Sequence, residues 1–212
     1  QGFGTSTINI NGVAKLYKSN HKIVSDRIVA GTYIIAAVML NSRFEIKNLN
    51  PNHLVSLIDT LKIMGANIHI KKSSIIVDKS YKLQSAKITT LPYPGFPTDL
   101  QAQIMALMCL VNGNSVIKET IFENRFMHVP ELNRLGAKIK VIKDTAYIKG
   151  NQTFKAAQVM ASDLRASVSL ILAGLCAEGE TTINRVYHLD RGYEPIEKML
   201  SGLGPDIRRE KK

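Results

Sequence analysis

The sequence has no tryptophan, only two cysteines and few aromatic side chains, which make up 6% of its residues. Few aromatics leave little material for the stacking platforms of single-strand nucleic-acid binding. Cys109 and Cys176 lie in apolar runs without metal-ligand spacing, which argues against a disulfide scaffold or zinc site and predicts a reducing, cytoplasmic location. The longest charge-free run, residues 100–117, contains several polar residues and is a poor membrane span, and no secretory signal opens the chain.

The remaining composition is that of an ordinary globular protein with a strong positive charge. The 212 residues are 45% apolar and 21% charged, enough for one large domain or two small ones. Lysine and arginine total 28 against 17 acidic residues, a formal net charge of +11. This charge favours an anionic ligand, either a phosphate-bearing metabolite or a nucleic acid, and it does not distinguish between them.

The sequence contains three copies of one unit, at about residues 26–77, 99–148 and 163–207. Each copy opens with a small hydroxyl residue followed by an aspartate, namely Asp26, Asp99 or Asp163. Such residues are typical of a helix N-terminus, where side-chain oxygens accept from free backbone N–H groups and a carboxylate meets the positive end of the dipole. Thr98 and Gln101 form a capping-box pattern, so Thr98 is expected to cap the second helix and leave Asp99 for a ligand.

Each aspartate precedes a helix that is apolar on all sides, at residues 28–40, 100–111 and 164–177, a pattern that indicates buried helices. Short strands are expected at 43–47, 115–118 and 181–184, and each is followed by an amphipathic helix that ends at a capping glycine, Gly65, Gly136 or Gly204. Extended segments then resume at 67–70, 138–142 and 206–208. The pattern predicts an α/β domain of three βαβαββ repeats. The three buried helices are expected to converge with their N-termini on one face, an anion site.

Four motifs carry a resemblance to a known family: PGFPTDLQAQ at 94–103, ETIFENRFMHVPEL at 119–132, AQVMASDLRAS at 157–167 and YHLDRGYE at 187–194. They resemble signatures of the UDP-N-acetylglucosamine 1-carboxyvinyltransferase family, and the likeness covers nearly the whole chain. It implies the inside-out α/β barrel domain of enolpyruvyl transferases. It also implies transfer of enolpyruvate from phosphoenolpyruvate to the 3-hydroxyl of UDP-N-acetylglucosamine with release of phosphate, the first committed step of peptidoglycan synthesis. No metal, organic cofactor, membrane or nucleic-acid partner is implied.

The resemblance further implies that the chain carries only part of such an enzyme. Residues 1–10 resemble the end of a loop that enters a strand, without a start methionine. Residues 1–23 resemble the tail of a missing N-terminal domain, and residues 24–212 correspond to the second enolpyruvyl-transferase domain. The missing domain would be a partner and would carry a reactive-cysteine loop. The chain alone is therefore expected to be inactive.

The resemblance assigns site residues by motif. Asp99 matches the aspartate that meets the reacting sugar hydroxyl, and a carboxylate can accept that proton. Arg191 matches an arginine that contacts phosphoenolpyruvate, which guanidinium can grip with two parallel hydrogen bonds. The other positions expected to bind substrate are Ile121, Arg125, Asp163 and Arg165. His128 and both cysteines are expected to be structural.

Three other functions remain open at this stage. The related transferase acting on shikimate 3-phosphate has the same fold and donor, although the motifs at 96–99 and 123–127 favour the sugar nucleotide. A nucleic-acid-binding module is suggested by the charge and by fold kinship with RNA phosphate cyclases, which is weak support for function. A remnant without turnover is the third.

Overall fold

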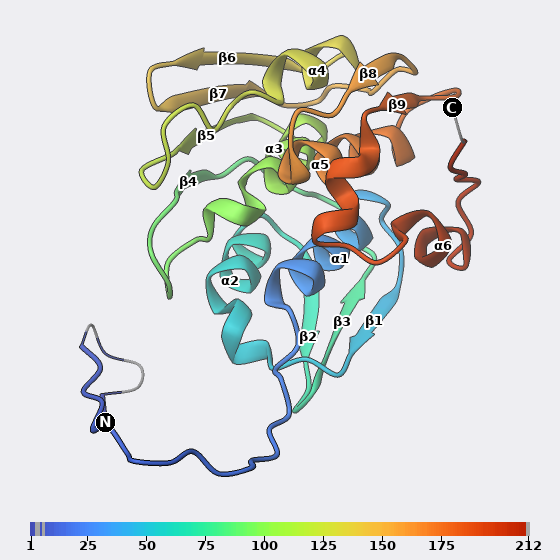
Figure 1. Cartoon of the computed structure of the whole chain (residues 1–212). Helices are drawn as coiled ribbons and strands as arrows, with labels where there is room; N and C mark the ends of the chain where they lie inside the picture. The colour runs from blue at the N-terminus through green and yellow to red at the C-terminus, as the bar shows by residue number, and fades with distance from the viewer. Residues whose placement is uncertain (3–4, 6, 211–212) are drawn as a thin grey trace.

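The computed structural model describes residues 1–2, 5 and 7–210. Residues 7–25 form an extended, exposed segment that runs away from the body of the molecule (Figure 1). The expected loop and strand at residues 1–10 fall partly on residues 3, 4 and 6, which lie outside the described residues. The described residues of this stretch, 1–2, 5 and 7–10, contain no strand. The folded body begins at the first helix.

Three buried helices form the centre of the body: α1 (Arg27–Met39), α3 (Gln101–Leu110) and α5 (Leu164–Leu175). Their bounds lie within two residues of those predicted, because apolar residues surround each axis and every face is covered. Helix α3 packs against both α1 and α5. Its approach to α1 is close: a Cβ at Gly31 would lie 2.6 Å from a Leu100 methyl group, so any larger residue there would require Leu100 to shift.

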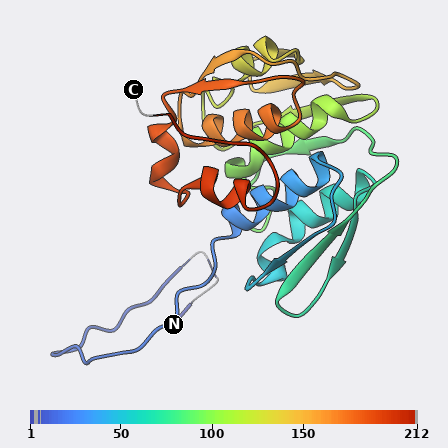
Figure 2. The same cartoon turned by 90° about the vertical axis from the view of Figure 1, so that its right-hand side faces the viewer.

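Three sheets lie around these helices (Figures 1 and 2). The first is antiparallel with the order β1-β3-β2, formed by β1 (Phe44–Lys47), β2 (Asn67–Ile70) and β3 (Ser74–Asp78). The second has the order β4-β5-β7-β6 and contains β4 (Lys87–Thr89), β5 (Asn114–Lys118), β6 (Lys138–Ile142) and β7 (Thr145–Lys149). The third pairs β8 (Gln158–Met160) with β9 (Thr182–Asn184) in parallel.

A second helix follows the strand in each unit: α2 (Val55–Ile63), α4 (Val129–Arg134) and α6 (Ile196–Ser201). Two 3₁₀ helices, η1 (Pro51–Leu54) and η3 (Val186–Arg191), precede α2 and α6. The predicted glycine stops are confirmed for α2 and α4, where Gly65 and Gly136 directly follow the C-cap residues with φ angles of +95° and +101°, a left-handed conformation that costs a glycine little. The predicted stop at Gly204 is wrong: α6 ends at Ser201 with Gly202 as its C-cap, and Gly204 lies beyond it.

Among the described residues, the full order βαβαββ is visible in the second unit, β4-α3-β5-α4-β6-β7. The first unit lacks a described strand before α1, and the third lacks a described hairpin after α6. The extended segment predicted at 206–208 forms no strand. Pro205 has no N–H to donate, and the segment is instead joined to the body by side chains, with Arg209 2.9 Å from Asp190 and 3.2 Å from Glu197. In the part of the chain that is described, no helix is long and apolar enough to cross a bilayer.

Candidate active site

The aspartates that begin the three units differ in the hydrogen-bond partners of their carboxylates. Asp26 caps α1, accepting from Ile28 N at 2.7 Å and Val29 N at 3.3 Å. Asp163 caps α5, where its Oδ1 accepts from Arg165 N at 2.8 Å and Ala166 N at 3.0 Å. These bonds satisfy N–H groups that a helix start leaves unpaired. The N–H bonds help hold the pKa of Asp163 below its usual value, although burial opposes them.

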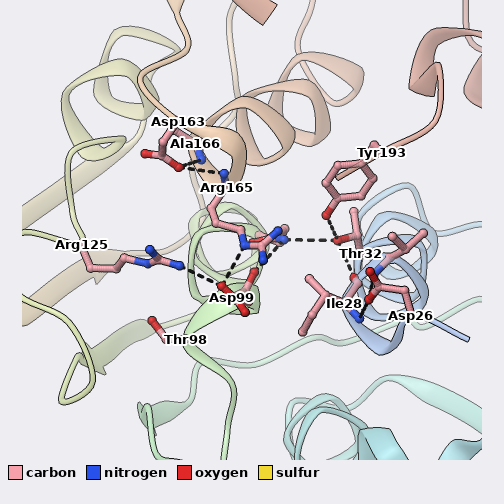
Figure 3. A network of polar contacts seen from close by, with 12 residues as sticks. Asp26, Ile28, Thr32, Thr98, Asp99, Arg125, Asp163, Arg165, Ala166 and Tyr193 are labelled. Atoms are coloured by element: carbon pink, nitrogen blue, oxygen red, sulfur yellow. Dashed lines mark hydrogen bonds and ion pairs between the residues drawn. The ribbon is translucent and has the colours of Figure 1, made fainter. Parts of the chain in front are cut away.

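Asp99 caps no helix, because its carboxylate is held by two arginines instead (Figure 3). Its Oδ1 accepts from Arg125 Nη2 and from Arg165 Nε, each at 2.9 Å. The three side chains are 35%, 26% and 21% exposed, so the cluster is partly buried and still open to a ligand. Among residues 1–2, 5 and 7–210, no hydrogen bond reaches the other carboxylate oxygen, Oδ2. Two positive charges against one negative charge leave the cluster cationic.

The expected capping box at Thr98 is wrong. Helix α3 is entered through the 3₁₀ turn η2 (Thr98–Leu100), whose N-cap is Pro97 and which has no side-chain cap. The Thr98 hydroxyl points elsewhere and donates to Glu119 Oε2 at 2.8 Å. Helix α3 is entered through a tight 3₁₀ turn, and the Asp99 carboxylate pairs with the two arginines and caps no backbone N–H.

A polar chain beside Asp99 connects α3 with α1 (Figure 3). Gln103 Nε2 donates to the Asp99 carbonyl at 3.0 Å and to Thr32 Oγ1 at 3.2 Å. Thr32 donates its one hydroxyl hydrogen to the Ile28 carbonyl, so at the 2.9 Å contact with Thr32 the Tyr193 hydroxyl is the donor. Burial is the main cause that raises the Tyr193 pKa, and it keeps this donor protonated at neutral pH.

The convergence of the three helix starts follows from these contacts. Arg165, the second residue of α5, reaches Asp99 in front of α3, and Gln103 in the first turn of α3 reaches Thr32 in α1. The predicted convergence is therefore confirmed. A carboxylate and two guanidinium groups stand where helix N-termini already favour anions.

The structure does not bring every predicted site residue into this cluster. Arg191 ends η3 with an exposed side chain, and within the described ranges it makes no ion pair. Its neighbour Gly192 lies against the start of α5, where a Cβ would be 2.8 Å from Leu164 Cδ2. Ile121 is half-buried, and its N–H donates to Glu119 Oε1 at 2.8 Å.

His128 and the cysteines are buried or half-buried, as expected of structural residues. His128 is 2% exposed, and burial is the main cause that lowers its pKa to about 4, so it is neutral at physiological pH. Burial raises the pKa of Cys109 to about 12 and that of Cys176 to about 11, which keeps both as thiols and unreactive. In the described part of the chain, no group of three or more His, Cys, Asp or Glu side chains could hold a metal ion.

Sequence reasoning missed the residues that support the cluster: Thr32, Thr90, Gln103, Glu119 and Tyr193. Gln103 carried a local signal, since it follows Asp99 by four positions on a helix and so lies on the same face. The others had none. The contacts that tie them to the cluster span 21 to 161 positions of the chain, beyond the reach of any local pattern.

Comparison with known proteins identifies the class of this fold. The enolpyruvyl transferase NikO from Streptomyces tendae superposes with a TM-score of 0.81 at 29% identity, over 88% of this chain and 44% of that chain. EPSP synthase from Acinetobacter baumannii superposes with a TM-score of 0.72 over 90% of this chain and 48% of its own, and at 19% identity it supports the fold alone. The predicted enolpyruvyl-transferase fold is confirmed.

A family model described as EPSP synthase (3-phosphoshikimate 1-carboxyvinyltransferase) matches residues 1–200, and the chain belongs to that family. Within it, the chain is 53% identical over 203 residues to UDP-N-acetylglucosamine 1-carboxyvinyltransferase of Pelagibacter ubique, covering 96% of this chain and 49% of the relative. It is also 53% identical over 211 residues to the protein of the same name from Myxococcus xanthus, covering 100% and 50%. The resemblance found in the motifs is confirmed, and the chain spans about half the length of these relatives.

Proposed function

We propose that this chain supplies one side of the active site of a cytoplasmic UDP-N-acetylglucosamine 1-carboxyvinyltransferase. The observation that carries the proposal is Asp99, held by Arg125 and Arg165 where three helix starts converge, in a chain 53% identical to relatives of that name. The second side belongs to an N-terminal domain. In this proposal the reaction commits a sugar nucleotide to peptidoglycan synthesis and uses no metal or organic cofactor.

The chemistry is addition followed by elimination. The 3-hydroxyl oxygen of UDP-N-acetylglucosamine bonds to C2 of phosphoenolpyruvate, C3 gains a proton, and a tetrahedral intermediate forms. Loss of a proton from C3 and of phosphate from C2 restores the double bond. Asp99 Oδ2 is the acceptor for the hydroxyl proton, since both arginines contact the other oxygen, Oδ1.

The arginines have two roles in this proposal. By fixing Oδ1 they orient Asp99, and their charge, with the N-termini of three helices nearby, stabilises the anionic phosphate and carboxylate groups of the substrates. Arg191 binds phosphoenolpyruvate when the second domain closes, which suits an exposed guanidinium without an ion pair among the described residues. Ile121 and Asp163 line the nucleotide side.

The test is a reconstitution. The chain alone is expected to release no phosphate from phosphoenolpyruvate and UDP-N-acetylglucosamine, because half of the charges that surround the transition state are missing. Addition of the N-terminal half of the Pelagibacter ubique relative, joined by fusion at the corresponding boundary, is expected to give turnover. Robust turnover by the chain alone contradicts the half-site proposal. Turnover only with shikimate 3-phosphate as acceptor assigns the other substrate, and a correctly folded but inactive fusion supports a remnant.

A further inference from the structure

Glu119 is a buried carboxylate that no substrate role accounts for. It follows β5 directly, is 4% exposed, and lies behind the loop that carries Arg125. Its Oε1 accepts from Thr90 Oγ1 and Ile121 N, each at 2.8 Å, and from Phe122 N at 3.3 Å. Burying a charged or polar group is costly unless its hydrogen bonds are made. The number of hydrogen bonds to this buried acid therefore indicates a specific structural role.

All of these partners donate. Backbone N–H groups can only donate, and Thr90 Oγ1, which accepts from Thr120 N at 2.9 Å, donates its hydrogen to Glu119. The Thr98 hydroxyl donates to the second oxygen, Oε2, at 2.8 Å. The side chain therefore acts as an acceptor on both oxygens, and neither an alanine nor a glutamine satisfies the same set.

The two oxygens hold two different segments. Oε2 holds Thr98, the residue before Asp99, and Oε1 holds Ile121 and Phe122, the beginning of the loop that reaches Arg125. The Asp99–Arg125 ion pair joins these same two segments 26 positions apart. One buried carboxylate thus fastens both sides of the pair.

We propose that Glu119 is a positioning residue that sets the register of Arg125 against Asp99. It touches neither substrate nor reacting atoms. Its effect on turnover rests on the proposed function, whereas its effect on the ion pair does not. Arg165 provides the internal comparison, because it reaches Asp99 from α5, whose start is fixed by the Asp163 cap and by packing against α3.

The deciding experiment measures hydrogen exchange by NMR in the full 212-residue chain. With Glu119→Ala, exchange of the Ile121 amide and of the Arg125 guanidinium is expected to rise about tenfold, the scale of one lost hydrogen bond. Exchange at Arg165 Nε is expected to stay within about threefold of the parent. The matched control is Glu123→Ala, an exposed acid in the same loop, expected to leave all three rates unchanged. Unchanged Arg125 exchange in Glu119→Ala, or equal release of Arg125 and Arg165, overturns the proposal.

Conservative variants keep the test decisive where Glu119→Ala does not fold. Glu119→Gln keeps an acceptor for the loop N–H groups and is expected to restore slow exchange at Ile121. Thr98→Val removes only the bond to Oε2 with little change of shape, and is expected to speed Arg125 exchange at least about threefold. Thr98→Ser keeps the hydroxyl and is expected to restore the parent rate. Equal rates in Thr98→Val and Thr98→Ser overturn the role of that bond.

The kinetic consequence is measured in the reconstituted fusion. Glu119→Gln is expected to lower kcat about tenfold while KM for the sugar nucleotide changes less than about twofold, because a misplaced arginine affects the transition state more than ground-state binding. Parent-like kcat overturns this consequence. An inactive parent fusion counts against the proposed function alone, and the exchange rates still decide the role of Glu119.

Discussion

At the scale of single residues, side chains at equivalent positions of the repeats make different contacts in the folded chain. Asp26, Asp99 and Asp163 open equivalent units, yet two of them cap helices and the third is gripped by arginines. Asp26 and Asp163 each cap through a single oxygen, Oδ1, so a second oxygen left out of the cap does not distinguish Asp99 from them. Its pairing with two guanidinium groups does, and this difference makes Asp99 the catalytic candidate of the three.

Asp99→Asn in the reconstituted fusion is expected to lower kcat at least about 100-fold, because the amide keeps the shape but cannot accept the hydroxyl proton. The Kd for UDP-N-acetylglucosamine is expected to change less than about threefold. Steady-state kinetics and calorimetry measure the two quantities. Asp59→Asn, an exposed change on α2, is the control. Turnover near that of the control would make Asp99 a structural residue.

His128 predicts an acid-sensitive stability. Its folded pKa of about 4 lies below the value of about 6.5 for an unperturbed histidine, so the unfolded chain binds the proton first as the pH falls. Stability is therefore lost from about pH 6.5 downwards, and the loss from this group is complete near pH 4, with an upper bound of about 3 kcal/mol. Urea unfolding across this range is the measurement. His128→Gln is expected to give a flatter profile than the parent; parallel profiles would contradict the assignment.

At the scale of elements, helix starts are stabilised in two ways. Helices α1 and α5 begin at aspartate caps, while α3 begins through a 3₁₀ turn that Glu119 holds by way of Thr98. An aspartate cap acts within one turn of its own helix. The 3₁₀ entry of α3 depends on Glu119, 21 positions away from Thr98.

Asp26→Ala is expected to lower the free energy of unfolding by about 1 kcal/mol, the usual cost of removing an aspartate cap. Asp26→Asn, which still accepts at the N-cap, is expected to cost less. Urea unfolding at pH 7 measures both, with the exposed Asp59→Ala as control. Equal stability of Asp26→Ala and Asp26→Asn would show that the cap contributes nothing measurable.

At the scale of the whole molecule, the chain carries a strong positive charge, and the arginine pair at Asp99 remains partly exposed to water. The net charge of +11 and the two arginines at Asp99 attract anions over a distance, but charges that remain in contact with water are screened over about 8 to 10 Å at moderate salt. Under the proposed function, the affinity of the isolated chain for anionic ligands is therefore expected to fall as ionic strength rises.

Calorimetric titration of the chain with UDP-N-acetylglucosamine is expected to show weak binding that falls at least about fivefold between 0.05 and 0.5 M NaCl, as the Debye length shortens. In the fusion the same change of salt is expected to have a smaller effect, because domain closure removes water from the contacts. Uridine, which lacks the diphosphate, is the uncharged control. Salt-independent binding by the chain would contradict an exposed electrostatic site.

Local chemistry determined the parts of this protein that the sequence predicted. Helix starts at Asp26 and Asp163, stops at Gly65 and Gly136, and the buried character of α1, α3 and α5 all follow from interactions within a few residues, which a sequence displays directly. Asp99, Arg125 and Arg165 were selected because they lie in motifs that resemble a known family. Such motifs single out residues but do not show which of them are in contact.

Tertiary structure alone decided how those residues meet. Arg165 and Asp99 are 66 positions apart, Tyr193 and Thr32 are 161 apart, and Glu119 lies 21 positions from Thr98. These pairs form because α3 buries itself between α1 and α5, and the packing brings their starts together. Thr98 shows the limit of local reasoning: its sequence predicted a cap, but a buried carboxylate from another segment offered its hydroxyl a charged acceptor, and hydrogen bonds to charged groups are the stronger ones.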